Sequence, residues 1–162
     1  MEKIFEPISK SKHSNYSFSP LSKSTNNFIS LINLTHCPIY LVELKIIATY
    51  FPIFFIKEKN GNFSLRALFC LYGNNNLYID TNGWWKALYL PLHLRCLPFS
   101  KVKNKNSNDD FLCFISDSKL VSKKQIPKNI PFFDNRGNIT DGLQEIMDLM
   151  TNIKKNSLKT QE

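Results

Sequence analysis

The sequence predicts a mixed α+β fold, with a small, mostly antiparallel sheet between about residues 53 and 115, short flanking helices and a C-terminal amphipathic helix. First, short β-branched and aromatic runs alternate with Asn-Gly turns, a pattern typical of hairpins. Second, apolar residues recur at helical spacing after Asp141. Third, 43% of the residues are hydrophobic and 13% are aromatic, which is enough to build a core. A partly closed barrel is an alternative arrangement of the same strands.

The length of 162 residues favours one domain with a loose end. Residues 1–30 are rich in Ser, Lys and Asn and keep no regular hydrophobic period, so we expect a flexible N-terminal arm. Residues 31–155 are the expected domain, and residues 156–162 are expected to form a polar tail.

The central elements follow from local signals. Apolar residues at 39, 42, 46 and 47 indicate a short helix over 39–48 with one packed face. Asn60-Gly61 lies between two strand-like runs and predicts a hairpin, because Asn and Gly accept the positive φ of its turn. The expected strands are 53–56, 63–72, 77–80 and 111–115.

A second Asn-Gly turn, Asn82-Gly83, precedes two tryptophans. Consecutive strand residues face opposite ways, so we expect one of Trp84 and Trp85 in the core and the other at the surface. Pro91 then suits the first turn of a helix of about two turns that must end before Pro98.

The C-terminal helix has a clear start and a clear apolar face. Asp141 is the expected cap, and Leu143, Ile146, Met147 and Met150 form the stripe. We expect this stripe to pack on the protein's own sheet rather than in a partner's groove.

The net charge is +8 and the isoelectric point is near 9.3, but the basic residues are spread along the chain. The one concentration, residues 101–130, has seven Lys or Arg against three Asp or Glu. Nucleic acid is therefore a disfavoured partner, since such proteins usually gather basic residues on one element. The sequence shows no Sec signal and no membrane span, so the cytoplasm is the default location, and export by a route without an N-terminal signal stays open.

Metal, cofactor and nucleophile motifs are not found. The four cysteines contain no C-x-x-C and are expected as reduced, buried thiols, although their even number leaves disulfides open. His13, His36 and His93 are far apart in sequence and indicate no metal site. With neither a nucleophile motif nor a Gly-rich phosphate loop, we expect no cofactor, and an enzymatic activity is uncertain.

Several segments resemble one known family in order and spacing. They are Glu43-Leu44, Phe51-Pro52-Ile53-Phe54-Phe55, Ala67-Leu68-Phe69-Cys70-Leu71, Asn76-Leu77-Tyr78-Ile79-Asp80 and Phe132-Phe133-Asp134 with Gly137. The most specific is W-x-x-x-Y-x-P-x-x-x-R-x-x-P-F, which stands complete from Trp85 to Phe99.

Over roughly residues 37–155 the chain resembles the SapC family, bacterial proteins named for a link to a surface layer (S-layer). It departs from the family pattern at Cys96, Leu97 and Ile115, and it is expected as a short member, because relatives usually continue past the helix. The resemblance implies an association with surface-layer, protein-modification or uptake systems, and no reaction.

The candidate site lies in the best-matched segment. Arg95 could clamp a carboxylate or phosphate, or could instead be a structural residue stacked on Trp85. The favoured hypothesis is a non-enzymatic module that binds a protein or peptide. The expected binding residues are Asp80, Trp84, Trp85, Tyr89, His93 and Arg95.

Two alternatives are kept beside it. An enzyme, or an enzyme's accessory subunit, would need Asp80, His93 and Arg95 to converge in a pocket. Asp80 has the simpler interpretation of a turn cap, and Tyr89 and His93 would share a helix face only if the helix began before Pro91. A weak nucleic-acid binder would use residues 101–130.

Overall fold

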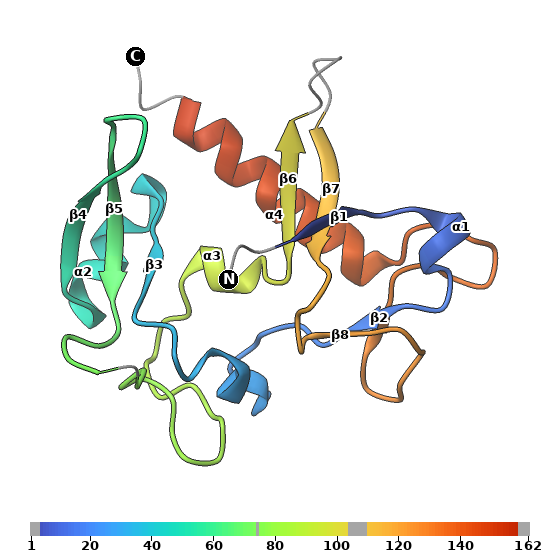
Figure 1. The fold of residues 1–162 in the computed structure, drawn as a ribbon, viewed down its shortest axis with the longest axis horizontal. Coiled ribbons are helices and arrows are strands. Elements are labelled where there is room, and N and C mark those ends of the chain that lie inside the picture. The colour runs from blue at the N-terminus through green and yellow to red at the C-terminus, as the bar shows by residue number, and fades with distance from the viewer. Residues whose placement is uncertain (1–3, 74, 104–109, 159–162) are drawn as a thin grey trace. The chain divides into compact units, whose positions relative to one another are not determined.

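The computed structural model describes residues 4–73, 75–103 and 110–158 (Figure 1). The chain divides into two compact units. Unit 1 comprises Met1–Pro20 and Cys96–Asn152, and unit 2 comprises Leu21–Arg95 and Ile153–Glu162. The sequence indicated one domain over 31–155, and this two-part division was not expected, because each unit is closed by segments that lie far apart in the chain.

The mixed α+β class is confirmed. The described strands form three small antiparallel sheets of three strands each, rather than one continuous sheet. No sheet in the described ranges closes into a barrel, so the alternative arrangement is wrong. No described helix combines the length and the apolar character needed to cross a membrane.

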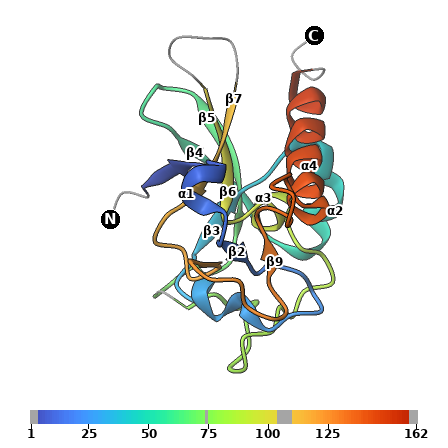
Figure 2. The same cartoon turned by 90° about the vertical axis from the view of Figure 1, so that its right-hand side faces the viewer.

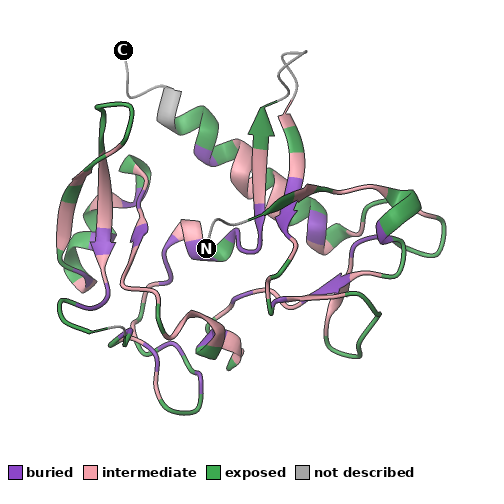
Figure 3. Ribbon diagram, in the orientation of Figure 1, coloured by how far each residue is buried: buried purple, intermediate pink, exposed green. Residues whose placement is uncertain are grey.

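The first sheet of unit 1 has the order β1-β7-β6. Strand β7 (Asp110–Ile115) confirms the strand expected over 111–115 and pairs with β6 (Phe99–Lys103), with Phe99 opposite Phe114. Burial increases along β7 toward its C-terminal end (Figure 3). Strand β6 was not among the strands expected from the sequence, and the residues that follow it, 104–109, lie outside the described residues.

Part of the expected arm forms secondary structure in unit 1. Strand β1 (Phe5–Pro7) pairs with β7, and α1 (Lys10–His13) follows it. Strand β2 (Ser17–Phe18) lies between β8 (Val121–Ser122) and β9 (Ile130–Pro131) in the second sheet. These pairings join residues about a hundred positions apart, so no local period in the sequence could reveal them.

The core of unit 1 is aromatic and is covered by the C-terminal helix, α4 (Asp141–Leu158), which Figure 2 shows from the side. Leu143 is fully buried in it, and Ile146 and Met150 pack against it, which confirms that the stripe packs on the protein itself. Asp141 is the first helical residue rather than the cap. The buried members are Phe18, Phe99, Phe114, Phe132, Phe133 and Leu143.

Unit 2 is built on the third sheet, in the order β3-β5-β4. The predicted hairpin is confirmed: β4 (Ile53–Lys57) and β5 (Phe63–Leu68) are antiparallel, and Gly61 has a φ of 86° in their turn. The helix expected over 39–48 is a 3-10 turn, η2 (Leu41–Glu43), followed by α2 (Leu44–Tyr50). The remaining elements are η1 (Asn27–Leu31) and β3 (His36–Pro38).

Between β5 and α3 (Leu92–Arg95), the described residues 69–73 and 75–91 of unit 2 form no regular strand, and we call them the strand-free segment (Figure 1). The strand expected over 77–80 is reduced to one isolated bridge between Ile79 and Trp85, because a tight turn follows at once. Helix α3 is one turn rather than two and begins after Pro91, so the condition under which Tyr89 and His93 would share a helix face is not met.

Candidate functional site

The turn from Asp80 to Trp84 is fixed by its own backbone and one carboxylate. Asp80 Oδ1 accepts hydrogen bonds from the backbone N–H of Asn82 at 2.9 Å and of Trp84 at 2.8 Å. Gly83 has a φ of 82°, and its N–H donates to the Asp80 carbonyl. Asp80 therefore acts as the turn cap that the sequence favoured over an acid in a site.

Trp85 anchors the segment from inside. It is 5% exposed, and its indole N–H donates to the Tyr89 carbonyl at 2.8 Å. Its ring packs in an aromatic cluster, where such contacts stabilise beyond the area they bury. The rings around it are Phe28, Phe51, Phe69 and Tyr78.

Trp84 lies at the surface, with 41% of its area exposed, so the expectation of one core and one surface tryptophan is confirmed. Other large apolar side chains of the same segment are exposed too. They are Leu71, Tyr72, Leu77 and Leu88. This segment thus presents several exposed apolar side chains, and one of them, Trp84, lies on the turn that Asp80 holds in place.

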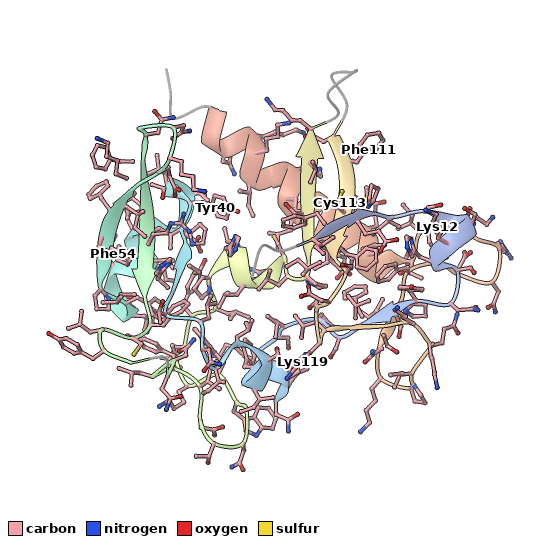
Figure 4. The ribbon with its side chains drawn as sticks, viewed as in Figure 1. Lys12, Tyr40, Phe54, Phe111, Cys113 and Lys119 are labelled. Carbon is pink, nitrogen blue, oxygen red and sulfur yellow. The ribbon has the colours of Figure 1, made fainter. Side chains whose placement is uncertain are left out.

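Glu43 is the buried acid of unit 2, and its position was not expected, because the sequence placed it among the polar positions of a one-faced helix. It is 2% exposed. Its Oε1 accepts the backbone N–H of Tyr40, labelled in Figure 4, at 3.0 Å. Its Oε2 accepts the Tyr89 hydroxyl and the Leu92 N–H, each at 2.9 Å. One carboxylate therefore ties η2 to the segment before α3 and to the first residue of α3.

Tyr89 is held neutral by these surroundings. Burial raises the pKa of its hydroxyl, and the negative charge and hydrogen bond of Glu43 raise it further. The nearby Arg95 guanidinium lowers the same pKa by a smaller amount, so Arg95 lies within electrostatic reach of Tyr89. Tyr89 serves as a hydrogen-bond donor to Glu43 and is not a proton-transfer group near neutral pH.

Arg95 is the last residue of α3 and is exposed. Its side chain forms no ion pair with any described residue. His93, two residues earlier, is half-buried in the same turn of helix.

A pocket of about 400 Å³ opens in unit 2 beside the Asp80 turn. It contains Asp80 but neither His93 nor Arg95, so this pocket does not unite the three residues of the enzyme hypothesis. Its lining residues are Ile29, Ile32, Asn75, Asn76, Leu77, Ile79, Asp80, Thr81 and Lys86.

Asn76 is a residue of this pocket whose role the sequence did not reveal. It is 2% exposed, and its Nδ2 has no hydrogen-bond acceptor among the described residues. The only sequence signal was its place at the start of the Asn-Leu-Tyr-Ile-Asp segment.

The described residues contain no group of three His, Cys, Asp or Glu side chains that could hold a metal. All four cysteines are buried free thiols, so no disulfide forms. Burial raises the pKa of Cys37 and of Cys113, which keeps both thiols protonated and poorly nucleophilic.

Comparison with curated proteins and with solved structures finds no match. The SapC family model matches residues 8–162, which includes most of the segment expected to be an arm and extends beyond the 37–155 over which the motifs align. The chain belongs to the SapC family.

Proposed function

We propose that this SapC chain is a binding module for a protein or peptide partner, and that the partner contacts the strand-free segment of unit 2. The observation that carries the proposal is Trp84: a large aromatic side chain, 41% exposed, on a turn held by Asp80 and anchored by the buried Trp85. Rigid, exposed aromatic residues are the usual anchors of protein interfaces, because they bury much area and lose little conformational entropy.

Arg95 supports the same proposal. Tryptophan and arginine are both enriched among the residues that dominate binding energy, and Arg95 is exposed. In this proposal Trp85, Tyr89 and Asp80 position the surface, whereas Trp84 and Arg95 contact the partner. His93 is assigned to the support of α3.

The partner class follows from the family association. We propose a protein of a bacterial surface-layer, protein-modification or uptake system. The compartment in which the two proteins meet is then the compartment of that partner. Nothing in this proposal requires a cofactor.

The test is quantitative affinity capture from the native host lysate, read by mass spectrometry. Trp84→Ala and Arg95→Ala are compared with matched substitutions of exposed residues in unit 1. Phe111→Ala is the aromatic control, because Phe111 is 48% exposed on β7 (Figure 4), and Arg136→Ala is the cationic control. Circular dichroism confirms that each variant folds.

We expect one or more proteins that wild type and both controls capture and that Trp84→Ala and Arg95→Ala lose. A partner lost with Phe111→Ala or Arg136→Ala instead would move the surface to unit 1. A captured set that disappears after nuclease treatment and falls steeply with salt would replace the proposal with nucleic-acid binding through the basic segment 101–130.

A further inference from the structure

Most edge strands of the described sheets carry a feature that prevents pairing with another strand. An edge strand exposes backbone N–H and C=O groups, so proteins usually keep it short or place Lys or Pro on it. Strands β8 and β9 have two residues each, and β1 and β3 have three residues that include Pro7 and Pro38. Strand β6 has five residues and carries Lys101 and Lys103.

Strand β4 is an edge that lacks this protection (Figure 1). It has five residues, and the first four, Ile53-Phe54-Phe55-Ile56, include neither a charged residue nor Pro. Phe55 is 68% exposed, and Phe63, on the same face of the sheet in β5, is 67% exposed. An uncharged and exposed edge of this length is a site at which another strand can pair.

The hydrogen bonds at the two ends of β4 show which of its backbone groups are open. The Pro52 carbonyl accepts the Leu68 N–H at 2.9 Å, and the Glu58 N–H donates to the Asn62 carbonyl at 2.7 Å. Because these groups alternate along an antiparallel pair, the even-numbered positions face β5 and the odd-numbered positions face away from it, where no described strand pairs with them. The residues with open N–H and C=O groups are Ile53, Phe55 and Lys57.

The same edge of a second copy matches this pattern. Outward positions must face outward positions in an antiparallel pair, so the two copies can align with Phe55 opposite Phe55. Phe54 then lies opposite Ile56, and Lys57 lies opposite Ile53. The two Lys57 side chains are at opposite ends of the paired strands, about 14 Å apart along them. This register therefore pairs aromatic and aliphatic side chains and places no like charges opposite each other.

We propose that two copies of this chain associate through β4, in antiparallel register about a twofold axis at Phe55. The open N–H and C=O groups of each copy pair with those of the other. The two three-stranded sheets then form one continuous antiparallel sheet. This surface uses none of the residues assigned above to contact with the partner, so the inference goes beyond the proposed function and does not rest on it.

The test is sedimentation velocity of the full chain over a range of concentrations, where we expect a monomer–dimer equilibrium. Phe55→Pro removes the N–H at the axis but spares the hydrogen bonds to β5, which do not use it. Phe55→Lys places two like charges opposite each other. Each variant should dimerise at least about tenfold more weakly, because the first loses two hydrogen bonds and the second gains a repulsion.

Matched variants keep the test specific. Phe111→Lys makes the same change at an aromatic residue, 48% exposed, on the central strand β7, and should change the dimer affinity by less than about twofold. Trp84→Ala and Arg95→Ala should also leave the dimer unchanged, so loss of the partner and loss of the dimer are separate results. Circular dichroism checks each fold. If Phe55→Pro does not fold, Phe55→Lys decides, because that side chain is exposed.

Oxidative crosslinking tests the register. Opposite residues of a hydrogen-bonded pair have Cα atoms about 5.5 Å apart, within the range of about 4.4–6.8 Å that a disulfide spans. Phe55→Cys should therefore crosslink the two copies under a mild oxidant, whereas Lys57→Cys should not. Wild type is the background control, because its own four cysteines are buried.

Three results overturn the proposal. A wild-type chain that stays monomeric at its highest soluble concentration leaves β4 to a strand of another protein. A dimer that neither Phe55→Pro nor Phe55→Lys weakens has its interface elsewhere. A dimer that crosslinks through Lys57→Cys and not through Phe55→Cys has a different register.

Discussion

Replacing Glu43 tests whether one buried carboxylate holds the candidate segment in place. Glu43→Ala removes the acceptor of two backbone N–H groups and of the Tyr89 hydroxyl. Each buried donor left unpaired costs roughly 1–3 kcal/mol. Part of that is recovered, because the carboxylate no longer has to be desolvated and because the half-buried Tyr89 hydroxyl can turn to water. We therefore expect the free energy of unfolding to fall by about 3 kcal/mol.

Tyr89→Phe isolates one of these three hydrogen bonds. It leaves both backbone N–H groups paired with Glu43, so its expected cost is smaller, about 1.5 kcal/mol for a bond to a charged acceptor. Glu145→Ala is the control, because Glu145 is an exposed acid of α4 and should change stability by less than about 0.5 kcal/mol.

The assay is urea unfolding followed by tryptophan fluorescence, which reports on unit 2, with midpoints compared at a constant slope. The expected order of cost is Glu43→Ala, then Tyr89→Phe, then Glu145→Ala. A Glu43→Ala protein as stable as the Glu145→Ala control would refute the reasoning, as would a Tyr89→Phe protein that loses as much as Glu43→Ala.

Three further predictions concern the turns, the tryptophans and the response to pH. Gly83→Ala should destabilise the protein more than Gly61→Ala, although both glycines have positive φ. A Cβ at Gly83 would meet the Asn26 carbonyl oxygen at 2.5 Å, whereas a Cβ at Gly61 would meet nothing within 4 Å. Equal urea midpoints for the two variants would contradict this. Trp84→Phe should leave blue-shifted fluorescence that acrylamide quenches poorly, since the remaining Trp85 is buried; strong quenching would place Trp85 at the surface. Burial and the Arg66 charge lower the pKa of His36 below its ordinary 6.5, so the unfolded chain binds the proton more readily and the free energy of unfolding should fall as pH drops below about 6.5. His36→Gln should reduce that fall. An unchanged dependence of the free energy of unfolding on pH in this variant would contradict the prediction.

Much of the local structure could be predicted from the sequence. Asn60-Gly61 predicted a hairpin, and the adjacent positions of the two tryptophans predicted one buried and one exposed side chain. Both predictions succeed because turn chemistry and side-chain alternation depend only on neighbouring residues. The stripe of α4 was predictable for the same reason.

The remaining features depend on contacts between distant residues. Strands β1 and β2 are short and carry no period, so their partners in β7, β8 and β9 could not be inferred. Glu43 looks like a surface acid until its acceptors are matched to donors 46 and 49 residues away. The unpartnered amide of Asn76 is likewise visible only once its surroundings are known.

The central claim is that a partner touches the Trp84 surface of unit 2. The most direct measurement is photocrosslinking, with benzoylphenylalanine in place of Trp84 or, as the control, of Phe111 in unit 1, since both side chains are large, aromatic and exposed. The account predicts that the captured partner crosslinks to position 84 and not to position 111. A partner that is captured but crosslinks at 111 alone would contradict it.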